Sequence, residues 1–188
     1  MWHDIPQDKP AARAQIRAAR RMRDPRQRAA DGAALARYLT FTVAGLPVGH
    51  AAVYTALPTE PPTDETAALL RGLGWQLMLP ILLPDKDLAW RSFEGDGGGG
   101  EIGRDHGTDH IGLAGLVIVP ALAIDRHGLR LGQGGGSYDR ALARRSPGTL
   151  TIALVYDDEL VEVVPSEPHD LGVDAVITPR AGLLHLKY

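Results

Sequence analysis

The sequence predicts an α/β fold, namely a single-domain three-layer αβα sandwich with a mostly parallel, Rossmann-like sheet. Three observations lead to this prediction. Strand-like and helix-like patterns alternate from His50 onward, as expected when helices cover both faces of a parallel sheet. The segment 75–83 is apolar except at Gln76, which indicates a strand buried on both faces. The 188 residues show no internal repeat and no linker, so residues 1–188 are expected to form one domain.

Two helices are expected before the first strand. Residues 1–8 are interpreted as a loose tail. A helix with its body at 11–23 follows, because alanine and arginine are good helix formers. Asp24 followed by Pro25 is typical of an N-cap and first helical position, and predicts a second helix that ends near Leu39. Both helices are expected to pack on the sheet.

The rest of the chain is predicted to alternate between strands and helices. Apolar runs predict strands at 50–56, 75–83, 88–93, 116–119, 149–155 and 175–178. Thr63 is a candidate N-cap for a helix at 64–73, and a further helix is expected at 138–145. The polar stretch 94–113 is expected to be a flexible glycine-rich loop. It contains Gly98-x-Gly100-x-x-Gly103, but lacks the strand and helix that a dinucleotide-binding fingerprint requires.

A glycine-rich segment between Arg130 and Asp139 is the strongest chemical signal in the chain. Its residues are Gly132, Gln133, Gly134, Gly135, Gly136, Ser137 and Tyr138. Glycines that open a helix can turn successive N–H groups toward an anion, most commonly a phosphate. Arg130 can add a guanidinium fork for phosphate, and Asp139 can hold Mg²⁺. The segment matches neither a Walker A loop nor the dinucleotide fingerprint, and a plain glycine-rich turn remains an alternative.

The first helix carries a basic stripe, formed by Arg13, Arg17, Arg20 and Arg21. Such a stripe is often just a solvated helix face. The functional alternative is that Lys9 and Arg13, four residues apart and therefore on one face, reach an anionic ligand.

Composition excludes several classes of protein. The formal net charge of −3 gives no overall attraction to nucleic acid or to an anionic membrane. The absence of cysteine excludes disulfides and thiolate chemistry. No apolar run is long enough to span a bilayer, and no signal-peptide pattern is seen. A cytoplasmic protein without nucleic-acid or membrane partners is expected.

The run from Pro120 to Arg140 closely resembles the signature of the 5-formyltetrahydrofolate cyclo-ligase family, also called methenyltetrahydrofolate synthetases. Similar motifs lie at three other places: Lys9 with Arg13, Glu60 with Thr63, and the segment around Asp170. The resemblance implies an α/β enzyme that uses ATP and Mg²⁺ to convert 5-formyltetrahydrofolate to 5,10-methenyltetrahydrofolate, with release of ADP and phosphate. The expected partner is a reduced folate, and the protein is expected to be a monomer.

The resemblance also implies roles for individual residues. The catalytic residues would be Arg130 and Tyr138. ATP would be bound by Lys9, Arg13, Arg130, Gly132, Gln133, Gly134, Gly135, Gly136, Ser137 and Tyr138. The folate would be bound by Thr55 and Glu60, and Mg²⁺ by Asp139 and Asp170.

The chain departs from the family pattern at three places. Ser137 replaces the first of two tyrosines, Gln133 replaces an aromatic or basic residue, and a Gly-Ile-x-Glu-Pro pattern is missing before Leu116. One alternative is therefore a diverged member that binds nucleotide or folate without turnover. A nicotinamide-dependent oxidoreductase would need a complete glycine fingerprint. A nucleic-acid-binding protein would need aromatic residues among the arginines of the first helix.

Overall fold

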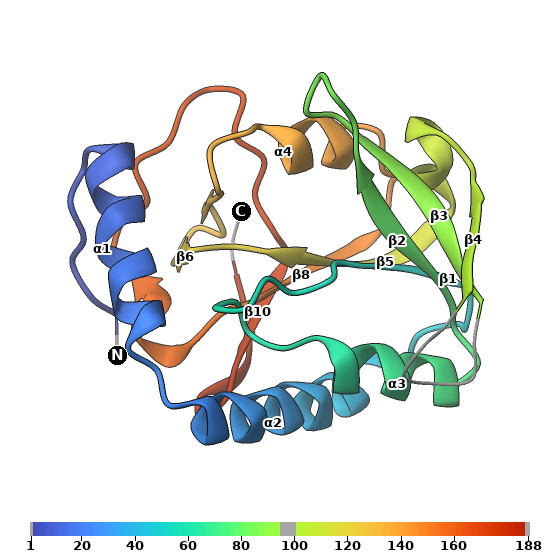
Figure 1. Cartoon of the computed structure of the whole chain (residues 1–188), viewed down its shortest axis with the longest axis horizontal. Helices are drawn as coiled ribbons and strands as arrows, with labels where there is room; N and C mark the ends of the chain where they lie inside the picture. The colour runs from blue at the N-terminus through green and yellow to red at the C-terminus, as the bar shows by residue number, and fades with distance from the viewer. Residues whose placement is uncertain (1, 95–100, 187–188) are drawn as a thin grey trace.

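The computed structural model describes residues 2–94 and 101–186, and shows one large and one small β-sheet with helices around them (Figure 1). The helices are α1 (Lys9–Arg21), α2 (Pro25–Val43), α3 (Asp64–Gly72) and α4 (Ser137–Leu142), with 3-10 turns η1 (Thr108–Leu113) and η2 (Asp157–Glu159). The strands of the large sheet are β1 (His50–Val53), β2 (Gln76–Leu82), β3 (Leu88–Glu94), β4 (Glu101–Asp105), β5 (Ala114–Pro120), β8 (Leu150–Leu154), β10 (Ala175–Thr178) and β11 (Gly182–His185). The small sheet contains β6 (Ala123–Asp125), β7 (Arg130–Leu131) and β9 (Leu160–Val161).

The large sheet has a parallel centre and antiparallel edges. Its strand order is β11-β10-β8-β5-β1-β2-β3-β4. The five strands from β10 to β2 pair in parallel, whereas β11, β3 and β4 are added antiparallel. The predicted α/β fold with a mostly parallel sheet is confirmed.

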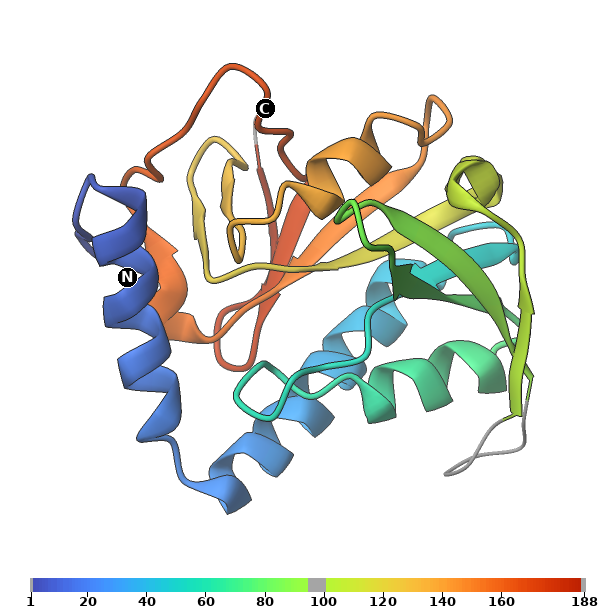
Figure 2. The same cartoon turned by 45° about the horizontal axis from the view of Figure 1, so that its top comes forward.

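Helices cover both faces of this sheet, as predicted (Figure 2). On one face, α2 and α3 contribute Leu35, Leu39 and Leu70 to a core with β1, β5, β8 and β10. On the other face, α4 and η1 contribute Leu142 and Ile111 to a second core against the same strands. Alternate side chains of each parallel strand therefore meet apolar partners on either side, and the molecule has three layers.

The packing of α1 differs from the prediction. Only α2 packs on the large sheet, whereas α1 packs Ala12 and Ile16 against a separate apolar cluster that includes Leu131 and Val161. These partners belong to the small sheet, which was not predicted because its strands are only two or three residues long. This packing places α1 beside the glycine-rich segment, which begins where β7 ends.

The predicted loose tail is also wrong for the residues that the structure describes. His3 forms a parallel bridge with Val161, its N–H donating to Leu160 O at 2.9 Å. Trp2 packs against the core and lies near the guanidinium of Arg126. A single aromatic residue in a polar segment gives no periodic pattern, so only the tertiary structure reveals this contact.

Asp24 and Thr63 occupy the N-cap positions of α2 and α3, as predicted, and Asp8 occupies that of α1. The carboxylate of Asp8 accepts from Ala11 N at 2.9 Å, and that of Asp24 accepts from Arg26 N at 2.7 Å. Thr63 makes no side-chain cap; its hydroxyl donates to Tyr54 O at 2.8 Å instead. Thr63 is therefore the N-cap residue of α3 by position, but its hydroxyl ties the start of α3 to the end of β1 instead of capping the helix.

Several boundaries shift from their predicted positions. Helix α2 continues to Val43, which is buried, four residues beyond the predicted end. Strand β1 ends at Val53, and β2 is fully buried only at Leu77 and Met78 rather than throughout. The second face of β2 is only partly covered because the sheet curves away there into its antiparallel edge.

The predicted loop at 94–113 is wrong in part. The described residues of this stretch form β4 and η1, and β4 pairs antiparallel with β3. Residues 97–100, including Gly98 and Gly100 of the rejected fingerprint, lie outside the described residues. A hairpin strand beside a glycine run shows little apolar periodicity, which explains why it was missed. Across the described ranges, no helix combines the length and the apolarity that crossing a bilayer would require.

A buried turn before the glycine-rich segment gives a first prediction. Gly128 has φ +85°, and a Cβ there would lie 2.5 Å from Val173 O. Gly128→Ala is expected to lower the free energy of unfolding by about 2–4 kcal/mol, because backbone strain and overpacking add. Chemical denaturation measures this. The control is Gly115→Ala in β5, where a Cβ meets nothing within 4 Å; equal stability of the two variants would contradict the prediction.

Candidate active site

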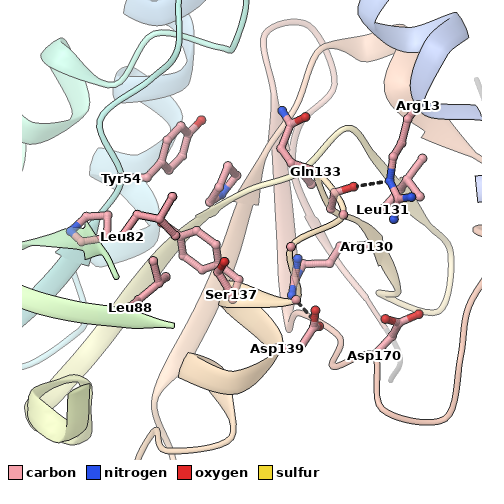
Figure 3. A pocket seen from close by; sticks show the side chains of 18 of the residues that line it. Arg13, Tyr54, Leu82, Leu88, Arg130, Leu131, Gln133, Ser137, Asp139 and Asp170 are labelled. Atoms are coloured by element: carbon pink, nitrogen blue, oxygen red, sulfur yellow. Dashed lines mark hydrogen bonds and ion pairs between the residues drawn. The ribbon is translucent and has the colours of Figure 1, made fainter. Parts of the chain in front are cut away.

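A cavity of about 350 Å³ lies where the parallel strands end. Its walls come from α1, from the segments that follow β1 and β5, and from the glycine-rich segment between β7 and α4 (Figure 3). Every residue that the sequence analysis assigned to a site lines this cavity. They are Lys9, Arg13, Thr55, Glu60, Arg130, Gly132, Gln133, Gly134, Gly135, Gly136, Ser137, Tyr138, Asp139 and Asp170. Ligand sites at the carboxyl ends of parallel strands are the rule in open α/β sheets.

The glycine-rich segment is held against α1. Arg13 Nε donates to Gly132 O at 2.9 Å, and Arg17 donates to the backbone carbonyl of Gln133 at 3.0 Å. Gly134 has φ +105°, and a Cβ there would lie 3.3 Å from Arg13 Cζ. A side chain at 134 is therefore strained by the backbone conformation, and the Arg13 guanidinium would have to shift by a few tenths of an ångström to admit it.

The basic stripe of α1 is not a solvated face. Arg13 and Arg17 contact the glycine-rich segment. Arg20 is buried and binds Glu159, whose two oxygens lie 2.7 and 2.8 Å from the guanidinium. Of the four arginines, Arg21 is the one that is exposed and for which the described part of the chain shows no such contact. Arg13 also lines the cavity, and its contact with an anionic ligand stays a prediction.

Arg130 and Asp139 form an ion pair inside the cavity, shown in Figure 3. Arg130 Nη2 lies 2.5 Å from Asp139 Oδ1, which also accepts from Leu171 N at 3.1 Å. Arg130 is only 5% exposed, and within the described ranges its Nε has no hydrogen-bond partner. A buried guanidinium with an unused donor at a cavity wall is suited to bind an anion.

Lys9 and Asp170 form a second ion pair. Lys9 Nζ lies 2.8 Å from Asp170 Oδ2 and 2.6 Å from Glu167 Oε2. Burial alone would lower the pKa of Lys9, but the hydrogen bonds to Asp170 and Glu167 raise it above its ordinary value. Burial alone would raise the pKa of Asp170, but Lys9 holds it below its ordinary value. Glu167 was not singled out in the sequence because it is an ordinary loop acid there.

The two predicted metal ligands, Asp139 and Asp170, stay a prediction in this structure. Asp139 and Asp170 line the same cavity, on the same side in Figure 3. The ligand atoms that lie within 4.8 Å of one another belong to Glu167, His169 and Asp170. Carboxylate oxygens are the donors that Mg²⁺ prefers, so the chemistry of Asp170 and Glu167 is compatible with such an ion. Asp139 is paired with Arg130 in this structure.

Glu60 is a buried carboxylate at the opposite wall. It is 4% exposed, and its Oε2 accepts from Leu57 N at 2.9 Å. Its Oε1 accepts from the side-chain amide of Gln133 at 3.0 Å. Thr55 lines the same wall and is exposed to it. The sequence placed Glu60 correctly after a strand, whereas its contact with Gln133 depends on the tertiary structure.

The remaining wall is apolar, and the sequence analysis missed most of it. Its residues are Tyr54, Pro80, Leu82, Leu88 and Tyr138. Leu82 is 67% exposed at the edge of the cavity, and Arg130 Cζ lies 5.9 Å from the centre of the Tyr138 ring. The cavity therefore joins a polar, phosphate-sized half to a half that suits a flat, weakly polar ring system.

The buried tyrosines give a second prediction, for alkaline pH. Burial raises the pKa of Tyr54, Tyr138 and Tyr156 above 10.0. A group whose pKa is higher in the folded state stabilises the fold below its unfolded pKa, and this stability is lost as pH rises through the folded value. Phenolate absorbance should therefore show these three of the five tyrosines ionising above the ordinary tyrosine range or only on unfolding. The Tyr138→Phe variant should lose one of the tyrosines that ionise late. If it instead lost a tyrosine that ionises early, the prediction would be contradicted.

The fold and the cavity define an α/β protein in which a glycine-rich segment lies beside a buried carboxylate at the carboxyl edge of a parallel sheet. A sequence model of the 5-formyltetrahydrofolate cyclo-ligase family matches residues 5–179. The chain belongs to this family, and the resemblance of its signature run is confirmed.

Individual relatives agree. The 5-formyltetrahydrofolate cyclo-ligase of Mycolicibacterium smegmatis is 34% identical over 149 residues, which cover 71% of this chain and 75% of that protein. The Escherichia coli K12 protein of the same name is 42% identical over 65 residues, covering 34% and 36%. A structure of a 5,10-methenyltetrahydrofolate synthetase from Mycoplasma pneumoniae superposes with a TM-score of 0.73 at 19% identity, covering 90% of this chain and 97% of that one. The Aquifex aeolicus structure gives 0.68 at 23% identity, covering 96% and 93%, and both support the fold.

Proposed function

We propose that this protein converts 5-formyltetrahydrofolate to 5,10-methenyltetrahydrofolate with ATP and Mg²⁺, releasing ADP and phosphate. The observation that carries the proposal is the single cavity in which an anion-binding half meets an apolar half with a buried acid. A reaction between a nucleotide triphosphate and a pterin needs both halves within one enclosure, so that the reacting atoms meet.

The proposed chemistry has two steps. The formyl oxygen attacks the γ-phosphorus of ATP, and ADP leaves. N10 of the folate then closes on the activated formyl carbon, phosphate departs with the oxygen, and the N10 proton is lost to solvent. Phosphoryl transfer of this kind depends on positioning and charge neutralisation more than on protein acid–base groups.

Each residue has a role in this proposal. Arg130 and Arg13 would bind the phosphates together with the N–H groups of the glycine-rich segment. Lys9 would move as a charged ammonium from its two carboxylates to a phosphate oxygen. Tyr138 would remain a protonated hydrogen-bond donor to the reacting oxygens, because burial raises its pKa. Mg²⁺ bound at Asp139 and Asp170 would supply further positive charge at the phosphates.

Folate recognition would use the other half of the cavity. The Glu60 carboxylate would accept from the N–H groups of the pterin, with Thr55 beside it. The apolar side chains of Leu82 and Leu88 would cover the flat face of the ring. We also propose that the protein is a cytoplasmic monomer. Sedimentation of the purified protein would test the monomeric state.

The test is the appearance of methenyltetrahydrofolate absorbance in a mixture of protein, 5-formyltetrahydrofolate, ATP and Mg²⁺. Turnover is expected to require all three additions and to be lost in Asp139→Ala. Turnover that persists in Asp139→Ala would leave the reaction standing and exclude Asp139 as an essential ligand. Absence of turnover together with an ATP-dependent rise in melting temperature would support the diverged member that binds without reacting.

A further inference from the structure

The side chain of Gln133 joins the two halves of the cavity. Its amide nitrogen donates to Glu60 Oε1 at 3.0 Å. Its amide oxygen accepts from Arg17 at 2.7 Å, and its backbone carbonyl accepts from the same guanidinium at 3.0 Å. One exposed glutamine therefore connects α1, the glycine-rich segment and the segment after β1.

This bond fixes a carboxylate that has few other donors. Both oxygens of Glu60 are held, one by the N–H of Leu57 and the other by Gln133. Glu60 is 4% exposed, so bulk water cannot replace a missing donor easily. A buried charged acceptor that loses a hydrogen bond is strongly disfavoured or changes its orientation. The direction of the Glu60 carboxylate therefore depends on where Gln133 lies.

The position of Gln133 depends in turn on the anion-binding segment. Gln133 lies between Gly132 and Gly134, whose conformations are set by contacts with Arg13. An anion bound by these backbone N–H groups and by Arg13 would hold the segment in one conformation. The side-chain amide of Gln133 moves with this backbone. When an anion is bound to the segment, the amide nitrogen of Gln133 is therefore held in one position relative to Glu60.

We propose that Gln133 is a positioning residue that couples the two substrates, so that a bound nucleotide triphosphate strengthens folate binding through the Gln133–Glu60 bond. This inference rests on the proposed function. Coupling of this kind is reciprocal, so folate strengthens nucleotide binding by the same factor.

The test measures the dissociation constant of 5-formyltetrahydrofolate with and without a non-hydrolysable ATP analogue and Mg²⁺. The analogue is expected to tighten folate binding by at least about fivefold in the unchanged protein. In Gln133→Ala this ratio is expected to fall to about one, because the connecting bond is gone. The control Gln15→Ala, which replaces an exposed glutamine on the same helix as Arg17, should keep the original ratio.

A second variant separates positioning from general structural damage. Gln133→Glu keeps the chain length and the acceptor for Arg17, but it cannot donate to Glu60 and adds a second negative charge there. Folate binding is expected to weaken by roughly tenfold, while the thermal unfolding of the ligand-free variant stays cooperative and close to that of the unchanged protein. A variant that is merely misfolded would lose this cooperative transition.

The outcomes distinguish this inference from the proposed function. An unchanged coupling ratio in Gln133→Ala, or independent binding of the two ligands to the unchanged protein, would overturn the coupling and leave the reaction standing. If the unchanged protein binds neither ligand, the proposed function fails, and the coupling fails with it.

Discussion

Replacement of Arg130 with methionine is expected to lower kcat/KM by roughly 10³-fold while the protein stays folded. Arg130 is the buried cation of the cavity, with one nitrogen on Asp139 and one without a partner among the described residues. Its guanidinium lies at the wall formed by the glycine-rich segment, where charge would develop on a transferred phosphoryl group. Methionine keeps much of the volume but removes the charge and the fork of donors.

The control for this variant is Arg126→Met in the same turn region. Arg126 pairs with Glu162 on the surface, where the two side chains are 53% and 42% exposed. This variant should retain activity within about twofold, since exposed ion pairs contribute little. Arg130→Lys should recover only part of the activity, because an ammonium lacks the bidentate fork. Initial rates over a range of both substrates give the comparison; activity of Arg130→Met near that of Arg126→Met would remove Arg130 from the proposed mechanism.

The central sheet could be predicted because its signals are local. Continuous apolar runs such as 116–119 and 149–155 are long enough to identify buried strands, and these became β5 and β8. The small sheet could not be predicted, because β7 and β9 contain two residues each and exist only through pairing with β6. Because α1 packs on the small sheet, the position of α1 could not be predicted from the sequence either.

The candidate site was predicted more completely than the fold around it. A dense signature such as 130–139 names its residues in consecutive order, and all of them line the cavity. What remained hidden were contacts between residues far apart in sequence, such as Lys9 with Glu167 and Gln133 with Glu60. Loop acids and amides carry no periodic pattern, so their partners can be identified only once the chain is folded.

One buried ion pair contributes to the attachment of α1 to the body of the protein, in addition to the apolar packing of Ala12 and Ile16. The guanidinium of Arg20 binds both oxygens of Glu159 and also donates to Ala121 O at 2.6 Å. Glu159 is 2% exposed and accepts from Tyr156 N at 2.9 Å. This pair connects the helix that carries Lys9 and Arg13 to the strand segments beside the cavity. Its loss should therefore affect both stability and ligand binding.

Glu159→Ala is expected to lower the free energy of unfolding by about 3–5 kcal/mol, because it leaves the buried charge of Arg20 without its partner. Urea denaturation measures this against Glu162→Ala, which breaks an exposed pair with Arg126 and should cost less than about 1 kcal/mol. The double variant Arg20→Met with Glu159→Leu removes both charges and should recover most of the loss. Equal stability of Glu159→Ala and Glu162→Ala would contradict the prediction. It would mean that buried Arg20 does not need the Glu159 carboxylate as its partner.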